Sequence, residues 1–473
     1  MVTVSSGRLI GTRGPGWERY LGIPYGLPPF AERRFAPPVP AEAWQDARVA
    51  DAHGPTAPQS PYRGAIAGIL TSVVIPGDDI LTLNVWAPEH ASGAPVMLWL
   101  HGGALERGTA ALEVYDGAPF ARDGVVFVSV NYRLGAEGFS VLEDAPRNLG
   151  LEDVAAAFAW VRREIAAFGG DPERITLAGE SAGGALVAAL LTRPEVAAAV
   201  AGAIVQSGPL IAEPPRRAGR VTRAMAKVLG RPATKASFAG ATPDELLEAR
   251  TTQSRGGSPL SGTPGYTLCI DQDTLPRAAR AALPEVAVPL LIGTNTDEYR
   301  LWFDPAALAR VGPLRLRLTA LALGVSGRRL RAYRAAWPDA SPGELLGQVL
   351  TDRVLRADAI AVARTRPAPT WVYEFAWPSP VRELRAAHAL ELGFMFDALA
   401  SEDARRMAGE QAPQALAEQM HGDWVRFVST GDPGWSVFSD AERVRRYDEE
   451  TTDVPLPRAE VLAAPERRAS GSS

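Results

Sequence analysis

The chain has 473 residues, of which 46% are hydrophobic, so it is long enough to bury a large core. Its 49 basic and 54 acidic residues give a formal net charge of -5, which excludes a strongly basic surface, and no nucleic-acid partner is expected. The single cysteine, Cys269, excludes an intrachain disulfide and a Cys-based metal cluster, and it is interpreted as a small core residue.

Expectations on location follow from the hydropathy of the chain. Residues 1–7 contain neither the basic nor the apolar run of a secretory signal. No apolar run approaches the roughly 18 residues that a bilayer-spanning helix needs. We therefore expect a cytoplasmic protein without a membrane partner. The sequence does not determine the oligomeric state, and it is compatible with a monomer.

The first half of the chain alternates between strand and helix patterns. Continuous apolar runs at 96–100 and 125–130 predict buried strands. Between Leu151 and Phe168, apolar residues recur at helical spacing, and the Gly-Gly-Asp-Pro sequence at 169–172 ends this helix. Further strands are predicted at 175–178, 203–206, 288–293 and 371–375. Strands separated by helices predict an α/β fold with a mostly parallel sheet.

Two stretches interrupt this alternation. Residues 209–270 are rich in Pro, Gly, Arg and Thr, and residues 305–365 have helical patterns. We expect both to be excursions from the sheet that line a substrate cleft. The residues from 469 to 473 are expected to form a solvated tail.

A candidate nucleophile lies between the strand at 175–178 and a small-residue helix pattern at 184–191. The sequence there is Gly179-Glu180-Ser181-Ala182-Gly183. Glycines on both sides of a serine, between a strand and a helix, are typical of a strained turn that exposes the hydroxyl at a helix N-terminus. The flanking strand and helix, more than the five-residue motif itself, therefore indicate a serine hydrolase.

A serine nucleophile needs a histidine base, and that base needs a carboxylate. His388 follows the strand at 371–375 and comes after Ser181, although a packed structural histidine would fit the same position. The acid should lie between the two, and Asp297 and Glu298 directly follow the strand at 288–293. Spacing alone does not choose between these two acids.

The segment His101-Gly102-Gly103-Ala104 follows the strand at 96–100. Consecutive small residues allow backbone N–H groups to point into a cavity, where they could stabilise an oxyanion. Glycines that serve only to turn the chain are the alternative. His101 itself is expected to shape the loop. Because the five histidines are never spaced i, i+3 or i, i+4, a zinc hydrolase is disfavoured.

Motifs distributed along nearly the whole chain resemble those of type-B carboxylesterases, the family of cholinesterases and para-nitrobenzyl-type esterases, and are most similar to compact actinobacterial members. Besides the serine motif and 101–104, they are Gly22-Ile23-Pro24-Tyr25-Gly26, 78–85, Asn131-Tyr132-Arg133-Leu134-Gly135, 148–151, 168–172, Thr296-Asp297-Glu298 and His388-Ala389-Leu390-Glu391-Leu392.

This resemblance implies a single α/β-hydrolase catalytic domain over residues 1–473 and a bacterial serine carboxylesterase that needs no metal or cofactor. By position it implies a Ser181, Glu298 and His388 triad. The implied oxyanion donors are the backbone N–H groups of Gly103, Ala104 and Ala182. Glu180 and Ser207 match residues that surround the triad, and Arg133 and Asp171 resemble a structural ion pair.

Several departures from the family pattern affect the expected specificity. Ile80 replaces a cysteine, so the family's Cys loop cannot form, and no Trp occurs between His53 and Gly77, which argues against choline esters. Leu105 replaces an aromatic residue and Tyr299 replaces a glycine. The expected substrate is a small-molecule ester. The same triad could act on carbamates, amides or polyester oligomers, and a non-catalytic binding homologue is a further alternative.

Overall fold

The computed structural model describes residues 1–255 and 265–462. The tail predicted at 469–473 and part of the excursion predicted at 209–270 lie outside the described residues.

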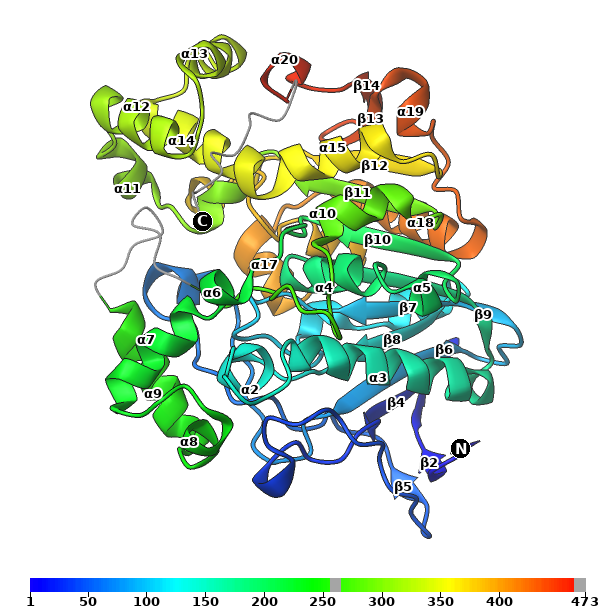
Figure 1. The fold of residues 1–473 in the computed structure, drawn as a ribbon. Helices are drawn as coiled ribbons and strands as arrows, with labels where there is room; N and C mark the ends of the chain where they lie inside the picture. Colours follow the sequence, from blue (N-terminus) through cyan, green and yellow to red (C-terminus); the bar gives the residue numbers. More distant parts are fainter. Residues whose placement is uncertain (256–264, 463–473) are drawn as a thin grey trace.

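A mixed sheet of 11 strands forms the centre of the molecule (Figure 1), in the order β14-β13-β12-β11-β10-β9-β7-β8-β6-β4-β3. The strands from β8 to β13 in this order run parallel, and those at both edges are antiparallel. The predicted, mostly parallel α/β sheet is therefore confirmed. The strands are β3 Thr12–Gly14, β4 Trp17–Pro24, β6 Thr82–Pro88, β7 Ala94–Leu100, β8 Val126–Val130, β9 Gly170–Glu180, β10 Gly202–Gln206, β11 Leu290–Asn295, β12 Thr370–Phe375, β13 Arg443–Tyr447 and β14 Thr452–Pro455.

Alternate residues of each central strand face two separate hydrophobic cores. In β7, Val96, Leu98 and Leu100 pack in one core, whereas Met97 and Trp99 pack in the other. This alternation is the geometry of a strand that is buried on both faces. The first core includes α3 Leu149–Glu164 and α4 Ala182–Leu190, and the second includes α1 Ala118–Arg122, α16 Leu392–Met395, α17 Glu402–Ala408 and α18 Gln414–Thr430.

The two excursions are largely helical. The first contains α6 Pro215–Ala218, α7 Arg220–Leu229, α8 Lys235–Ala239 and α9 Pro243–Ser254. The second contains α11 Pro305–Ala309, α12 Pro313–Ala322, α13 Gly327–Ala336, α14 Pro342–Thr351 and α15 Ala357–Thr365, with a π-helical turn at Asp352–Arg356. The helices α11–α13 project from one corner of the molecule in Figure 1. Residues of α12 and α13 pack with α14 in a small separate core.

The remaining elements are short. A separate three-stranded sheet, which the sequence did not predict, joins β1 Val2–Val4, β2 Gly7–Ile10 and β5 Arg48–Val49. The other helices are α2 Gly135–Phe139, α5 Pro194–Ala197, α10 Ala279–Ala282, α19 Phe438–Ala441 and α20 Ala459–Leu462. Cys269 is buried, as expected of a small core residue. Within the described ranges, no helix combines the length and the apolar character needed to cross a bilayer.

Candidate active site

Ser181 occupies a strained turn between β9 and α4. Its φ of 54° and ψ of -120° are unfavourable for a residue with a side chain, and its N–H donates to Gln206 O at 2.8 Å. A Cβ at Gly183 would collide with the Leu100 carbonyl oxygen, and one at Gly179 would meet the backbone of Gly183 at 2.6 Å. The glycines of the motif are therefore required by close backbone packing, and the turn has the predicted strand-to-helix geometry.

Glu298 lies directly beyond β11, at the start of a 3-10 turn spanning Glu298–Leu301. Its Oε2 is 2.5 Å from His388 Nδ1. Its Oε1 accepts hydrogen bonds from the Ser207 hydroxyl at 2.6 Å and from the Asn295 N–H at 2.7 Å. Both carboxylate oxygens of this buried side chain are thus engaged, which fixes the orientation of the imidazole.

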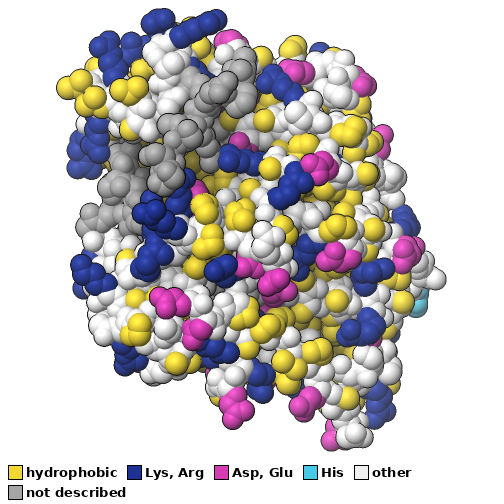
Figure 2. All heavy atoms as spheres, in the orientation of Figure 1, with side chains coloured by type: hydrophobic (Ala, Val, Ile, Leu, Met, Phe, Trp, Pro, Cys, Tyr) yellow, Lys and Arg dark blue, Asp and Glu magenta, His cyan; other side chains and the backbone are white. Residues whose placement is uncertain are grey.

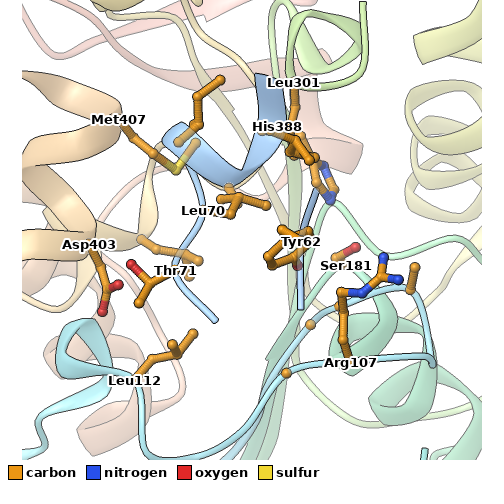
Figure 3. A pocket seen from close by; sticks show the side chains of 18 of the residues that line it. Tyr62, Leu70, Thr71, Arg107, Leu112, Ser181, Leu301, His388, Asp403 and Met407 are labelled. Carbon is orange, nitrogen blue, oxygen red and sulfur yellow. The ribbon is translucent and has the colours of Figure 1, made fainter. Parts of the chain in front are cut away.

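The other nitrogen of His388, Nε2, lies 3.0 Å from Glu180 Oε1. The two atoms are not aligned as a hydrogen bond, since this carboxylate oxygen has no hydrogen-bond partner. Within the described residues, no hydrogen bond joins His388 to Ser181 either, although both side chains line the same cavity (Figure 3). The Trp302 ring lies 4.7 Å from the imidazole, centroid to centroid. In enzymes without bound substrate, the hydrogen bond between a nucleophile and its base is often long or poorly aligned.

The electrostatics of this cluster favour a protonated imidazole. Burial alone would lower the pKa of His388, but the negative charges of Glu180 and Glu298 raise it to about 9. Burial raises the pKa of Glu180 to about 8, against the opposing effect of His388. The two groups are coupled, and each charge stabilises the other.

A buried polar network supports the loop that carries His388. The Asn295 side-chain amide donates to Ala387 O at 2.7 Å and to Glu391 Oε2 at 2.6 Å. Gln206 donates to Glu391 Oε1 at 3.2 Å, and Trp424 donates to Gln206 at 3.0 Å. Burial raises the pKa of Glu391 to about 6. Glu391 is part of the motif quoted above, but its sequence position gave no indication of this role.

The residues predicted to supply oxyanion donors lie beside Ser181. Ala182 is the first residue of α4, so its N–H has no partner within the helix. Gly103 and Ala104 have φ angles of 114° and 58°, and both line the same cavity as Ser181 and His388. No backbone hydrogen bond within the described chain uses the N–H groups of Gly103 or Ala104. The N–H groups of Gly103, Ala104 and Ala182 thus form no backbone hydrogen bond within the described residues, and their role as oxyanion donors stays a prediction.

His101 and Asp297 have other surroundings. The His101 imidazole is buried, lies 2.8 Å from Gly102 O and stacks on Tyr132, and burial lowers its pKa to about 4. The expected role of His101 in shaping the loop stays a prediction, which these contacts support. Asp297 accepts a hydrogen bond from Gln348 at 3.0 Å, and burial raises its pKa. Of the two acids that spacing left open, Glu298 is the one that the structure brings to His388.

The cavity in front of Ser181 has a volume of about 380 Å³. Thr251 and Ser254 of the first excursion contribute to its wall, as expected. No residue of the second excursion, 305–365, lines this cavity, and Leu301 and Trp302 just before it do so instead. At the end opposite Ser181, Figure 3 shows Asp403 and Thr71 among apolar side chains that include Leu70, Leu112 and Met407.

The polar side chains at this far end of the cavity, Asp403 and Thr71, have few hydrogen-bond or ion-pair partners. Asp403 Oδ2 accepts the Val114 N–H at 3.1 Å. No Arg, Lys or His of the described chain forms an ion pair with Asp403, and the buried Thr71 hydroxyl has no hydrogen-bond partner there. The cavity thus offers an uncompensated carboxylate and a free hydroxyl to a bound molecule.

One pairing inferred from the resemblance is corrected by the structure. Arg133 does not pair with Asp171 but with Asp153 of α3, at 2.6 Å between Arg133 Nη2 and Asp153 Oδ1, with both side chains fully buried. The Asp171 carboxylate instead accepts the N–H of Glu173 two residues later. Arg133 therefore forms the expected structural ion pair, but its acidic partner, Asp153, lies on α3.

Comparisons with known proteins agree along the whole chain. A sequence profile described as the carboxylesterase family matches residues 1–311. The chain is 34% identical to the para-nitrobenzyl esterase of Bacillus subtilis (strain 168), with 98% of this chain and 95% of that protein covered. It is 32% identical to the phenmedipham hydrolase of Pseudarthrobacter oxydans, with 91% and 90% covered. A crystal structure of a Geobacillus stearothermophilus carboxylesterase superposes with a TM-score of 0.86 at 32% identity, covering 98% of this chain and 99% of that one.

Proposed function

The chain belongs to the carboxylesterase family and is a serine hydrolase that acts on carboxylic esters, and we propose that Ser181, His388 and Glu298 perform this hydrolysis. The observation that carries the assignment is the 2.5 Å contact between Glu298 Oε2 and His388 Nδ1. The His388 imidazole lines the cavity that also contains Ser181 at its strained turn, whereas Glu298 is buried behind it. The fold is that of the α/β-hydrolases.

In the proposed mechanism, His388 Nε2 accepts the Ser181 hydroxyl proton as Oγ attacks the ester carbonyl carbon. The resulting oxyanion accepts hydrogen bonds from the N–H groups of Gly103, Ala104 and Ala182. When the tetrahedral intermediate collapses, the alcohol leaves with the proton from His388 and an acyl-serine remains. Water, deprotonated by the same imidazole, then attacks the acyl-serine and releases the acid.

In this proposal Glu298 keeps a proton on His388 Nδ1, so that Nε2 is free to act as the base. Ser207 and Asn295 hold the Glu298 carboxylate through its other oxygen. We further propose that Glu180 adjusts the proton affinity of His388, since its Oε1 lies 3.0 Å from Nε2.

The proposal extends to organisation and substrate. The three triad side chains and the three backbone N–H donors come from residues between 103 and 388, so we propose one catalytic domain over residues 1–473. The names of the relatives make para-nitrobenzyl esters and phenmedipham the first compounds to test. A panel of esters, carbamates and anilides of graded size would then define the reaction range. The expected cytoplasmic location stays a prediction, to be tested by fractionation of the source cells.

The decisive experiment replaces the nucleophile. Ser181→Ala should abolish turnover of a short-chain nitrophenyl ester and covalent labelling by a fluorophosphonate probe, while leaving the thermal unfolding midpoint close to that of the wild type. Ser439→Ala, which changes an exposed serine, is the matched control and should retain both activities. Undiminished turnover by the Ser181 variant would reject this nucleophile. An unlabelled, inactive wild type would instead favour the binding homologue.

A further inference from the structure

The segment from residue 305 to residue 336, which forms α11, α12 and α13, has an unusual charge. It contains seven arginines and no Asp, Glu or Lys, although the whole chain has a net charge of -5. Six of these arginines are exposed, namely Arg310, Arg315, Arg317, Arg328, Arg331 and Arg334. None of these six forms an ion pair with a described residue, so no carboxylate in residues 1–255 or 265–462 pairs with them.

The same corner of the molecule exposes large apolar side chains. Leu314, Leu318 and Leu321 of α12 are 70%, 59% and 70% exposed. Their i, i+4, i+7 spacing puts them on one face of the helix. The opposite face buries Leu316 and Ala320 against α13 and α14, so the outward leucines are not needed for this packing.

Arginines flank the exposed leucine face. At about 100° per residue, Arg315 and Arg317 fall on either side of it, between the outward and the buried face. Figure 2 shows Lys and Arg side chains together with hydrophobic ones over the corner where Figure 1 has α12 and α13. A leucine face flanked by arginines is the pattern of helices that lie in a lipid interface, with apolar side chains in the acyl region and guanidinium groups among the head groups.

We propose that α12 and its neighbours dock this enzyme onto an anionic lipid surface. The proposal concerns adsorption to one leaflet, whereas the expectation of no membrane partner rested on the absence of a spanning segment. A uniformly positive surface matches a uniformly negative bilayer. The surface begins three residues after Trp302, which lines the catalytic cavity, so adsorption would bring that cavity close to esters dissolved in the lipid.

Two other occupants fit the observations less well. In a symmetric dimer through this face, the arginines of one copy would oppose the same arginines of the other, and like charges would repel. A folded acidic protein would need an apolar pocket that accepts all three exposed leucines of α12, a helix at one corner of the molecule (Figure 1). A bilayer needs no preformed pocket, because exposed apolar side chains can enter its acyl region directly.

The test is co-sedimentation of the full chain with vesicles, comparing phosphatidylcholine alone with phosphatidylcholine mixed with phosphatidylglycerol. We expect binding to the mixed vesicles at low salt, weakened as salt screens the charges. The variant Arg315→Glu/Arg317→Glu should lower the partition coefficient about tenfold or more, because each surface arginine contributes a several-fold factor. Replacing Leu314, Leu318 and Leu321 by Gln should give a loss of similar size.

Matched controls separate this site from a general charge effect. Arg8→Glu/Arg122→Glu makes the same charge change at exposed arginines elsewhere, and Val49→Gln/Val228→Gln replaces exposed apolar residues elsewhere. Both should bind vesicles as the wild type does, and so should Ser181→Ala, because docking does not depend on catalysis. Thermal unfolding of each variant verifies that it is folded.

Four results would overturn the proposal. One is that equal amounts of the protein sediment with phosphatidylcholine vesicles and with the mixed vesicles. Another is an equal effect of the Arg8/Arg122 and Arg315/Arg317 variants. The third is that the protein binds soluble polyglutamate as tightly as it binds vesicles, and that the leucine substitutions do not change this binding. That result would assign the surface to an acidic polymer. Concentration-dependent dimers abolished by the leucine substitutions would assign it to a second copy instead.

Discussion

Glu180 Oε1 lies 3.0 Å from His388 Nε2, on the side of the imidazole opposite Glu298. The imidazole is thus held between two buried carboxylates. Because Nε2 is the atom proposed to accept the serine proton, the charge of Glu180 acts directly on the step that generates the nucleophile.

The first prediction concerns the pH dependence of Glu180→Gln. The negative charge of Glu180 raises the pKa of His388, and the imidazole must be neutral to act as a base. Removing that charge lowers the pKa of His388, so the acid limb of the kcat/KM profile should move to lower pH by about 1 unit or more. Initial rates on a nitrophenyl ester across a pH series measure this shift. An unchanged acid limb, or one that moves to higher pH, would contradict the proposed role of Glu180.

The second prediction ranks the two neighbouring acids. Glu298→Gln keeps the size of the side chain but removes the charge that orients His388 Nδ1, so kcat should fall by about 10⁴. Asp297→Asn is the matched control, since the Asp297 carboxylate bonds to Gln348 instead, and it should lose less than about tenfold. Single-turnover and steady-state rates of both variants test the ranking, and the reverse order would reject Glu298 as the acid.

These two predictions differ in how far the sequence alone supports them. The turn around Ser181 could be predicted because its strand, glycines and helix are contiguous. The pairing of Glu298 with His388 needed the family resemblance, since Asp297 precedes Glu298 directly and both follow the same strand. The approach of Glu180 to Nε2 depends on the loop that carries His388. Asn295, from a distant part of the chain, holds this loop through hydrogen bonds to Ala387 and Glu391.

The sequence did not predict the acidic partner of Arg133 or the small three-stranded sheet, because both depend on contacts between distant parts of the chain. The carboxylates of Asp153 and Asp171 are chemically equivalent, and only the packing of α3 decides that Arg133 reaches Asp153. The strands of the small sheet, β1, β2 and β5, are too short to give a clear alternating pattern. Long-range packing, rather than local preference, determines both features.

The third prediction tests the packing of the serine turn. Gly183→Ala would direct a Cβ into the Leu100 carbonyl oxygen, so it should displace the turn and reduce both the unfolding midpoint and kcat. Gly422→Ala is the matched control, because a Cβ there has nothing within 4 Å and Ala favours the α18 helix by up to about 1 kcal/mol. Thermal unfolding should therefore separate the two substitutions in opposite directions. A fully stable, active Gly183 variant would show that the close backbone contact is not required.

The fourth prediction concerns the uncompensated carboxylate at the far end of the cavity. An ester with a protonated amine that reaches Asp403 should be favoured in kcat/KM over its neutral isostere, because a charged hydrogen bond there replaces an unpaired group. Asp403→Asn preserves an acceptor for the Val114 N–H but removes the charge, so this preference should fall about tenfold while the neutral ester is hydrolysed as before. Glu402→Gln makes the same charge change at an exposed neighbour that pairs with Arg406, and it should keep the preference. The measurement compares ammonium and neutral esters in two series, one with the amine on the acyl chain and one with it on the alcohol. Equal selectivity of the wild type and the Asn variant in both series would show that Asp403 supports only the loop at Val114.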